Sequence, residues 1–122
     1  MSSVKAFEDL RIWQEARGLV KEIYSTFGVS SPAEKDYGFR DQVQRASVSI
    51  MNNIAEGFER NSDAEFARFL IIAKGSCGEV RSLLYTAQDL KYISDKDAEK
   101  LRDMSISISK GIYTLTKHLK NK

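Results

Sequence analysis

Apolar residues recur at intervals of three and four along four segments of the chain, and no segment of useful length alternates between apolar and polar positions. A spacing of about 3.6 residues is typical of amphipathic α-helices, whereas strands alternate with a period of two. The first segment covers residues 9–27 and is followed by Gly28, a residue type that commonly terminates helices. The spacing therefore predicts a first helix over these residues.

The second helix has two possible starting points in the sequence. Ser31-Pro32-Ala33-Glu34 has the form of a capping box with proline at the first helical position, which favours a start at Pro32. The helix could instead begin again after Gly38, and the pattern leaves both alternatives open. In either case the helix is predicted to end near Arg60 and Asn61.

Serine residues mark the starts of the third and fourth helices. Residues 62–65 (Ser-Asp-Ala-Glu) form a second capping box, and the helix that follows is predicted to end near Lys91. Ser94 is an N-cap candidate with aspartates in the following turn. Four amphipathic helices with short connections predict an all-α fold, in which residues 1–122 form a single antiparallel, up-down-up-down four-helix-bundle domain.

The second helix is apolar over a wider arc than a one-sided surface helix requires. Its apolar residues span roughly 180° of the helical wheel, whereas about 100° is enough to bury one face. We therefore expect a second buried surface against another copy of the chain, and the alternative is a wide core stripe in a monomer. The candidate residues for this oligomer interface are Val48, Met51, Ala55 and Phe58.

Four glycines, Gly57, Gly75, Gly78 and Gly111, fall inside the helical patterns. Each costs about 1 kcal/mol relative to alanine in a helix, so their presence suggests places where neighbouring backbones approach closely. Tolerance of glycine at the surface could account for one or two of them.

Length, composition and cysteine content favour a reduced, cytoplasmic, globular protein. The chain has 122 residues, of which 42% are hydrophobic and 30% charged, and this composition excludes disorder for most of the chain. The first residues lack the apolar core of a signal peptide, and no apolar run is long enough to span a membrane. A single cysteine, Cys77, cannot form an internal disulfide.

The residue types that common catalytic and metal sites need are scarce. His118 is the only histidine, which excludes a di-iron site built from Glu-x-x-His pairs. One histidine and one cysteine are too few for a structural zinc site. No glycine-rich loop follows a predicted strand, so P-loop and dinucleotide fingerprints are absent. We therefore expect no enzyme activity, no metal and no cofactor.

The charge of the chain is small but unevenly distributed. Nineteen lysine and arginine residues against seventeen aspartate and glutamate residues give a net charge of +2, which does not by itself indicate nucleic-acid binding. After Asp103 the chain contains lysines but no acidic residue. One interpretation is a cationic helix end that complements its own dipole. The other is a contact surface for nucleic acid, with the candidate residues Arg102, Lys110, Tyr113, Lys117 and Lys120.

Two motifs in the middle of the chain resemble those of a known family. The first is Arg45-Ala46-x-x-Ser49-Ile50-x-x-Asn53-Ile54-Ala55-Glu56-Gly57, followed by Arg60. The second is Phe69-Leu70-x-Ile72-Ala73-x-Gly75-Ser76-x-x-Glu79. Together with Phe7-x-x-Leu10-x-x-Trp13-x-x-Ala16 and Tyr37-Gly38-x-x-x-Gln42 upstream, they strongly resemble the 23S rRNA intervening-sequence protein family, also called the four-helix-bundle protein family.

The resemblance implies an antiparallel four-helix bundle that assembles as a homopentameric ring and has no known catalytic activity. Similar proteins are the accessory variability proteins of diversity-generating retroelements, in which a strongly basic ring engages nucleic acid and a reverse transcriptase. The polar residues of the first motif share one face of the second helix: Arg45, Ser49, Asn53, Glu56 and Arg60. They are interpreted either as a hydrogen-bond and ion-pair network within or between subunits or as a contact surface for RNA or another partner.

Pattern, charge and resemblance together predict a non-enzymatic, oligomeric four-helix bundle that serves as an adaptor associated with RNA or ribonucleoprotein. Its expected partners are further copies of the chain, RNA or another nucleic acid, and a partner protein, with no membrane. The alternative is a protein–protein scaffold or accessory factor with no affinity for nucleic acid.

Overall fold

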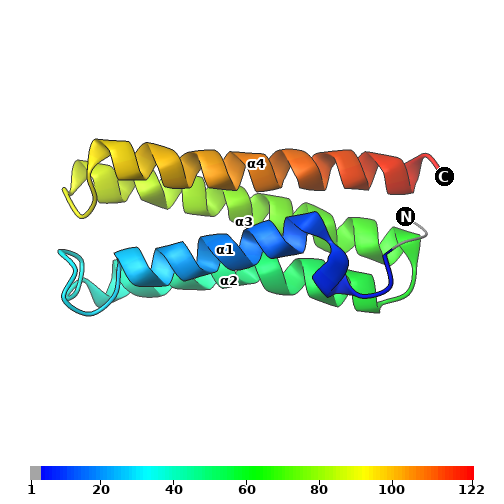
Figure 1. The fold of residues 1–122 in the computed structure, drawn as a ribbon, viewed down its shortest axis with the longest axis horizontal. Coiled ribbons are helices and arrows are strands. Elements are labelled where there is room, and N and C mark those ends of the chain that lie inside the picture. The colour runs from blue at the N-terminus through cyan, green and yellow to red at the C-terminus, as the bar shows by residue number, and fades with distance from the viewer. Residues whose placement is uncertain (1–3) are drawn as a thin grey trace.

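The structure, a computed structural model, describes residues 4–122 and contains four α-helices and no strand over that range. Successive helices run antiparallel, and the two ends of the described chain lie at the same end of the bundle (Figure 1). The prediction of an all-α, up-down-up-down four-helix bundle is therefore confirmed. The helices are α1 (Arg11–Thr26), α2 (Tyr37–Glu59), α3 (Asp63–Asp89) and α4 (Asp95–Lys120), and a short 3₁₀ helix, η1 (Phe7–Asp9), precedes them.

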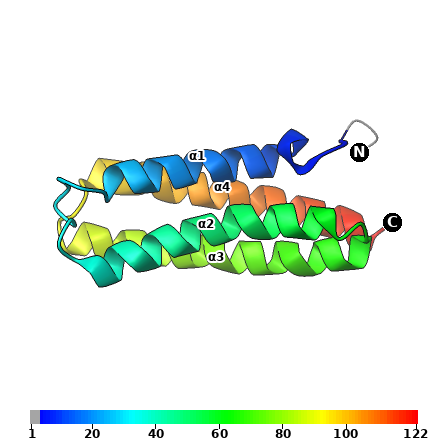
Figure 2. The same cartoon turned by 90° about the horizontal axis from the view of Figure 1, so that it is seen from below.

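Each helix packs against two neighbours. The helix α1 contacts α2 and α4, and α3 contacts the same two helices on the other side of the bundle (Figures 1 and 2). The apolar stripes meet between the four helices, where Leu19, Ile50, Leu70 and Ile108 are completely buried. The core therefore consists of the residues that the helical period places inward.

The second helix begins at Tyr37, so the alternative start at Pro32 is wrong and the start near Gly38 is the better one. Asp36 caps this helix, because its carboxylate accepts a hydrogen bond from the backbone N–H of Phe39 at 3.1 Å. The Tyr92 hydroxyl donates to the same carboxylate at 2.7 Å. The two hydrogen bonds lower the pKa of Asp36 below its ordinary value, and the bond from Tyr92 has the larger effect. The hydroxyl of Ser31 is buried and has no hydrogen-bond partner among residues 4–122, so it does not cap a helix.

The other predicted caps are present. The side chain of Ser62 accepts a hydrogen bond from the backbone N–H of Glu65 at 3.3 Å, and that of Ser94 accepts one from Asp97 at 3.1 Å. At the other end of the chain, Asp9 belongs to η1 rather than to α1, because its carboxylate accepts bonds from the backbone N–H groups of Lys5 and Ala6 at 3.2 Å each. The first α-helix therefore starts at Arg11, two residues later than predicted.

Much of the wide apolar arc of α2 is covered within one chain. Met51, Ala55 and Phe58 are partly buried and pack against the core, while Val48 is half-buried. The ring of Phe58 meets the ring of Phe66 edge-on, with centroids 5.8 Å apart. The segment η1 also contacts α2. A helical wheel of α2 considers that helix alone, so it does not show that η1 covers part of its surface. The width of the arc therefore does not by itself require a second copy of the chain.

Of the four glycines that the sequence pattern placed inside helices, two lie where neighbouring elements approach closely. A Cβ atom at Gly57 would lie 2.7 Å from the Cβ atom of Phe69, and one at Gly111 would lie 2.7 Å from Cγ2 of Ile12. By contrast, Gly75 and Gly78 on α3 have nothing within 4 Å of the corresponding position. Close approach therefore accounts for Gly57 and Gly111 but not for the two glycines of α3.

We expect Gly57→Ala and Gly75→Ala to change stability in opposite directions. The added methyl group at residue 57 must displace Phe69, and such overpacking costs about 1–3 kcal/mol. The same change at residue 75 meets no atom and improves helix propensity, which contributes roughly 0.5–1 kcal/mol. Urea unfolding followed by circular dichroism measures both free energies. Equal free energies of unfolding for the two variants would contradict the close approach of α2 and α3.

Candidate nucleic-acid interface

The polar motif residues of α2 lie along its boundary with α3. The hydroxyl oxygens of Ser49 and Ser76 are 2.9 Å apart, so they join the two helices directly. The side-chain amide of Asn53 donates to the backbone carbonyl of Ser49 at 2.8 Å and to its hydroxyl at 3.0 Å. Ser49, Asn53 and Ser76 therefore form a hydrogen-bonded network within one chain.

The charged members of the same motif are also held by partners within the chain. Arg45 pairs with Asp41 at 2.9 Å, and Arg60 pairs with Glu56 at 3.1 Å. The guanidinium of Arg60 also lies 4.9 Å from the ring centroid of Phe69. Each cation of this face thus has a carboxylate beside it, which reduces its attraction for a phosphate.

Four of the five predicted contact residues of α4 lie along a groove between α3 and α4, which is formed by two adjacent hollows. The first, named here the Ile71 hollow, has a volume of about 420 Å³ and is lined mainly by Ile71, Lys74, Tyr113, Thr116, Lys117 and Lys120. The second, the Arg81 hollow, has a volume of about 480 Å³ and is lined mainly by Lys74, Arg81, Ile106, Ser109, Lys110 and Tyr113. Lys74 and Tyr113 line both, so the two hollows adjoin, and together they are named here the α3/α4 groove.

The α3/α4 groove is cationic and contains no carboxylate. Its basic side chains are exposed to solvent, and the ion pairs of residues 4–122 all lie elsewhere. No acidic residue lines either hollow. Charges of one sign along a concave surface attract ions of the opposite sign, so this groove favours phosphate groups. The basic residues are Lys74, Arg81, Lys110, Lys117 and Lys120.

Arg102 is separated from this group. It lies nearer the start of α4, where its guanidinium donates to the side-chain oxygen of Gln88 at 2.6 Å. The same guanidinium lies 4.1 Å from the ring centroid of Tyr85. These contacts with α3 hold Arg102 in a half-buried position, and it lines neither hollow of the groove.

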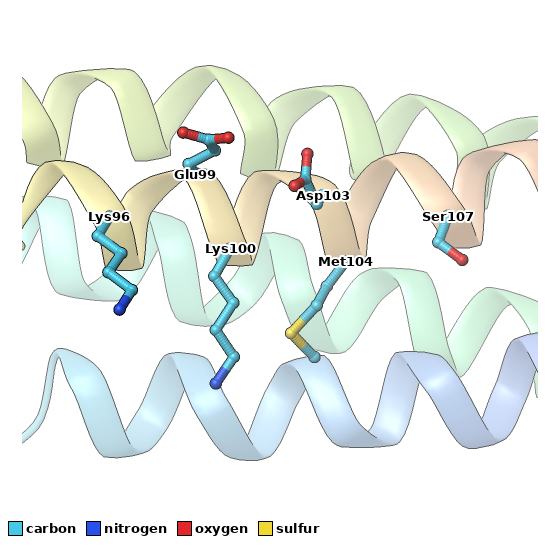
Figure 3. A pocket seen from close by; sticks show the side chains of 6 residues that line it. All are labelled: Lys96, Glu99, Lys100, Asp103, Met104 and Ser107. Atoms are coloured by element: carbon cyan, nitrogen blue, oxygen red, sulfur yellow. The ribbon is translucent and has the colours of Figure 1, made fainter.

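A further hollow of about 550 Å³ follows the first half of α4 and has a mixed charge. In Figure 3, the side chains of Lys100 and Met104 extend toward α1, whereas Glu99 and Asp103 point away from it. A phosphate bound there would meet both carboxylates, which offset the attraction of the lysines. The cationic surface of α4 is therefore confined to its second half.

Residues 8–118 match the family model described as 23S rRNA-intervening sequence protein. The chain belongs to this family. A crystal structure of a protein of unknown function from the S23 ribosomal protein family of Bacteroides thetaiotaomicron VPI-5482 has a similar fold, with a TM-score of 0.78 and 24% sequence identity. The similarity covers 87% of this chain and 98% of that one. No curated protein matches the sequence.

In this member of the 23S rRNA-intervening sequence protein family, Cys77 is buried in the core at 2% exposure. Burial disfavours the thiolate and raises the pKa of the Cys77 thiol to about 12, so the thiol is a poor nucleophile near neutral pH. Residues 4–122 hold no group of three or more His, Cys, Asp or Glu side chains placed to bind a metal ion. Within the same range, no helix is long and apolar enough to cross a membrane.

The α3 side of the groove was not predicted from the sequence. Lys74 and Arg81 lie seven residues apart, a spacing that places both on one face of a helix. Gly78 lies between them and has open space around it. The spacing of Lys74 and Arg81 could have indicated a basic face on α3. Only the packing of α3 on α4, however, places these two residues beside the lysines of α4.

We expect Ser49 and Ser76 to be energetically coupled. Removing either hydroxyl alone breaks the bond between α2 and α3, so Ser49→Ala and Ser76→Ala should each cost about 0.5–1.5 kcal/mol. The double variant should cost less than the sum, because the second change removes a group that has already lost its partner. Urea unfolding of the four proteins measures this coupling, with the exposed Ser82→Ala as a control. Strictly additive losses would argue against the hydrogen bond.

Proposed function

We propose that this protein is a non-enzymatic, RNA-binding adaptor that holds RNA phosphates in the α3/α4 groove and works as a ring of five copies. The observation that carries the proposal is the groove itself, in which five exposed cations from two helices lie without a neighbouring carboxylate. Like charges gathered in this way repel one another and stabilise nothing within the chain. An anionic partner offsets that repulsion, and a polyanion contacts several of the cations at once.

Membership of the 23S rRNA-intervening sequence protein family supports RNA as the polyanion, since the description of the family refers to rRNA. The resemblance of the motifs to that family supports the ring of five copies. A ring of five copies presents the α3/α4 groove five times, so a modest attraction in each copy becomes a multivalent one. The net charge of +2 is far from a strongly basic ring, so the proposal does not include the reverse-transcriptase partner of retroelement accessory proteins.

We expect RNA binding to depend on the lysines of α4 and to weaken steeply with salt. In fluorescence anisotropy at several salt concentrations, Lys110/Lys117/Lys120→Ala should lower affinity for all RNA sequences alike. It should also reduce the slope of log K against log salt by about 2, since each phosphate contact contributes roughly 0.7–0.9. The matched control Lys21/Lys96/Lys100→Ala removes the same charge from other surfaces and should change the slope much less.

Light scattering coupled to gel filtration accompanies these measurements, and the mass of each variant should be close to five chains. Failure to bind RNA even at low salt, with the ring intact, would favour the protein–protein scaffold. Binding that survives the change of the three α4 lysines would place the RNA on another surface, with the Arg45–Arg60 face of α2 as the next candidate.

A further inference from the structure

We infer that the α3/α4 groove selects single-stranded RNA, because the ring of Tyr113 offers a platform on which an unpaired base stacks. This inference rests on the proposed function and specifies which form of RNA the groove accepts. A groove that bound phosphates alone would accept a duplex and a single strand with little distinction.

Tyr113 lies at the centre of the groove. Its side chain is 58% exposed, and it lines both the Ile71 hollow and the Arg81 hollow. On α4, Lys110 precedes it by three residues and Lys117 follows it by four, so a cation flanks the ring on each side along the helix. An exposed aromatic ring between cations is the arrangement by which proteins hold a base and its neighbouring phosphates.

The hollows beside the ring have apolar or small polar linings and cationic edges. Ile71 and Thr116 line one, and Ile106 and Ser109 line the other. On α3, a Cβ atom at Gly78 would meet nothing within 4 Å beyond its own stretch of helix. Their volumes of about 420 and 480 Å³ lie within the range of ligand-binding pockets, so each has room for a flat ring.

Thr116 adds an unsatisfied hydroxyl to a residue that lines the Ile71 hollow. The residue is only 9% exposed, and its hydroxyl oxygen has no hydrogen-bond partner among residues 4–122. A buried hydroxyl without a partner costs free energy. The hydroxyl is itself buried in this structure, so it would meet a base only after χ1 rotates, and threonine has two accessible χ1 rotamers in a helix.

A base inside a duplex cannot use these features. Both of its faces are covered by neighbouring base pairs, so a duplex presents only phosphates, sugars and groove edges to the protein. A single strand can turn one base onto Tyr113 while its phosphates remain beside the lysines. The combination of an aromatic platform, a polar floor and cationic edges therefore favours an unpaired strand.

The test compares an A-rich RNA single strand with the duplex that it forms with its complement, both fluorescently labelled, by anisotropy at one salt concentration. The wild-type protein should bind the single strand more tightly. Tyr113→Ala should weaken single-strand binding by roughly 5- to 150-fold and leave duplex binding unchanged, while Tyr113→Phe should retain it. Thr116→Val should weaken single-strand binding by roughly 2- to 10-fold without loss of stability. Tyr37→Ala removes a tyrosine that is 72% exposed outside the groove and should change neither affinity.

The outcomes separate this inference from the function on which it rests. Equal affinity for both forms, unchanged in Tyr113→Ala and Thr116→Val, would overturn the inference and leave RNA binding in place. No binding of either form by the wild-type protein would overturn both. A lower oligomer mass in Tyr113→Ala would show that the ring of Tyr113 contacts another subunit, and this too would overturn the inference.

Discussion

The close contact of α2 and α3 at Gly57 is the constraint on which the other features depend. Because Gly57 has no side chain, Phe69 and Phe66 of α3 lie directly against the backbone of α2. In the resulting register Ser49 of α2 lies against Ser76 of α3, and the hydrogen bond between their hydroxyl groups joins the two helices. The opposite side of α3 then packs on α4, so that Lys74 and Arg81 border the same groove as Lys110 and Tyr113.

The two sides of α3 consequently differ in their chemistry. On the side that faces α2, the neighbouring polar residues of α2 have partners within the chain: Ser49 and Asn53 form hydrogen bonds, and Arg60 forms an ion pair. Toward α4, the cations of the α3/α4 groove take no part in the ion pairs of residues 4–122, and the hydroxyl of Thr116 has no hydrogen-bond partner in that range. Satisfied polar groups stabilise the fold, whereas unpaired charges and unsatisfied hydroxyls oppose it. For this reason the groove, rather than the polar motif face of α2, carries the proposed function.

The helices and two of their caps could be predicted from the sequence, because apolar spacing and capping serines act over a few residues. The start of α2 could not, since it depends on contacts between distant residues. Tyr92 bonds to Asp36 across 56 positions of the chain, and the guanidinium of Arg40 donates to the carbonyl oxygens of Phe27 and Glu34 in the preceding loop. In the candidate site, the lysines of α4 could be found from the absence of acids after Asp103. Lys74 could not, because only the packing of two helices brings it to the groove.

The most direct test of the account is to map where RNA touches the protein. RNA containing 4-thiouridine is bound at physiological salt, crosslinked with ultraviolet light and digested, and the modified peptides are identified by mass spectrometry. The account predicts adducts in the segments that border the α3/α4 groove, residues 71–81 and 106–120. Adducts confined to the α2 face between Arg45 and Arg60 would contradict it.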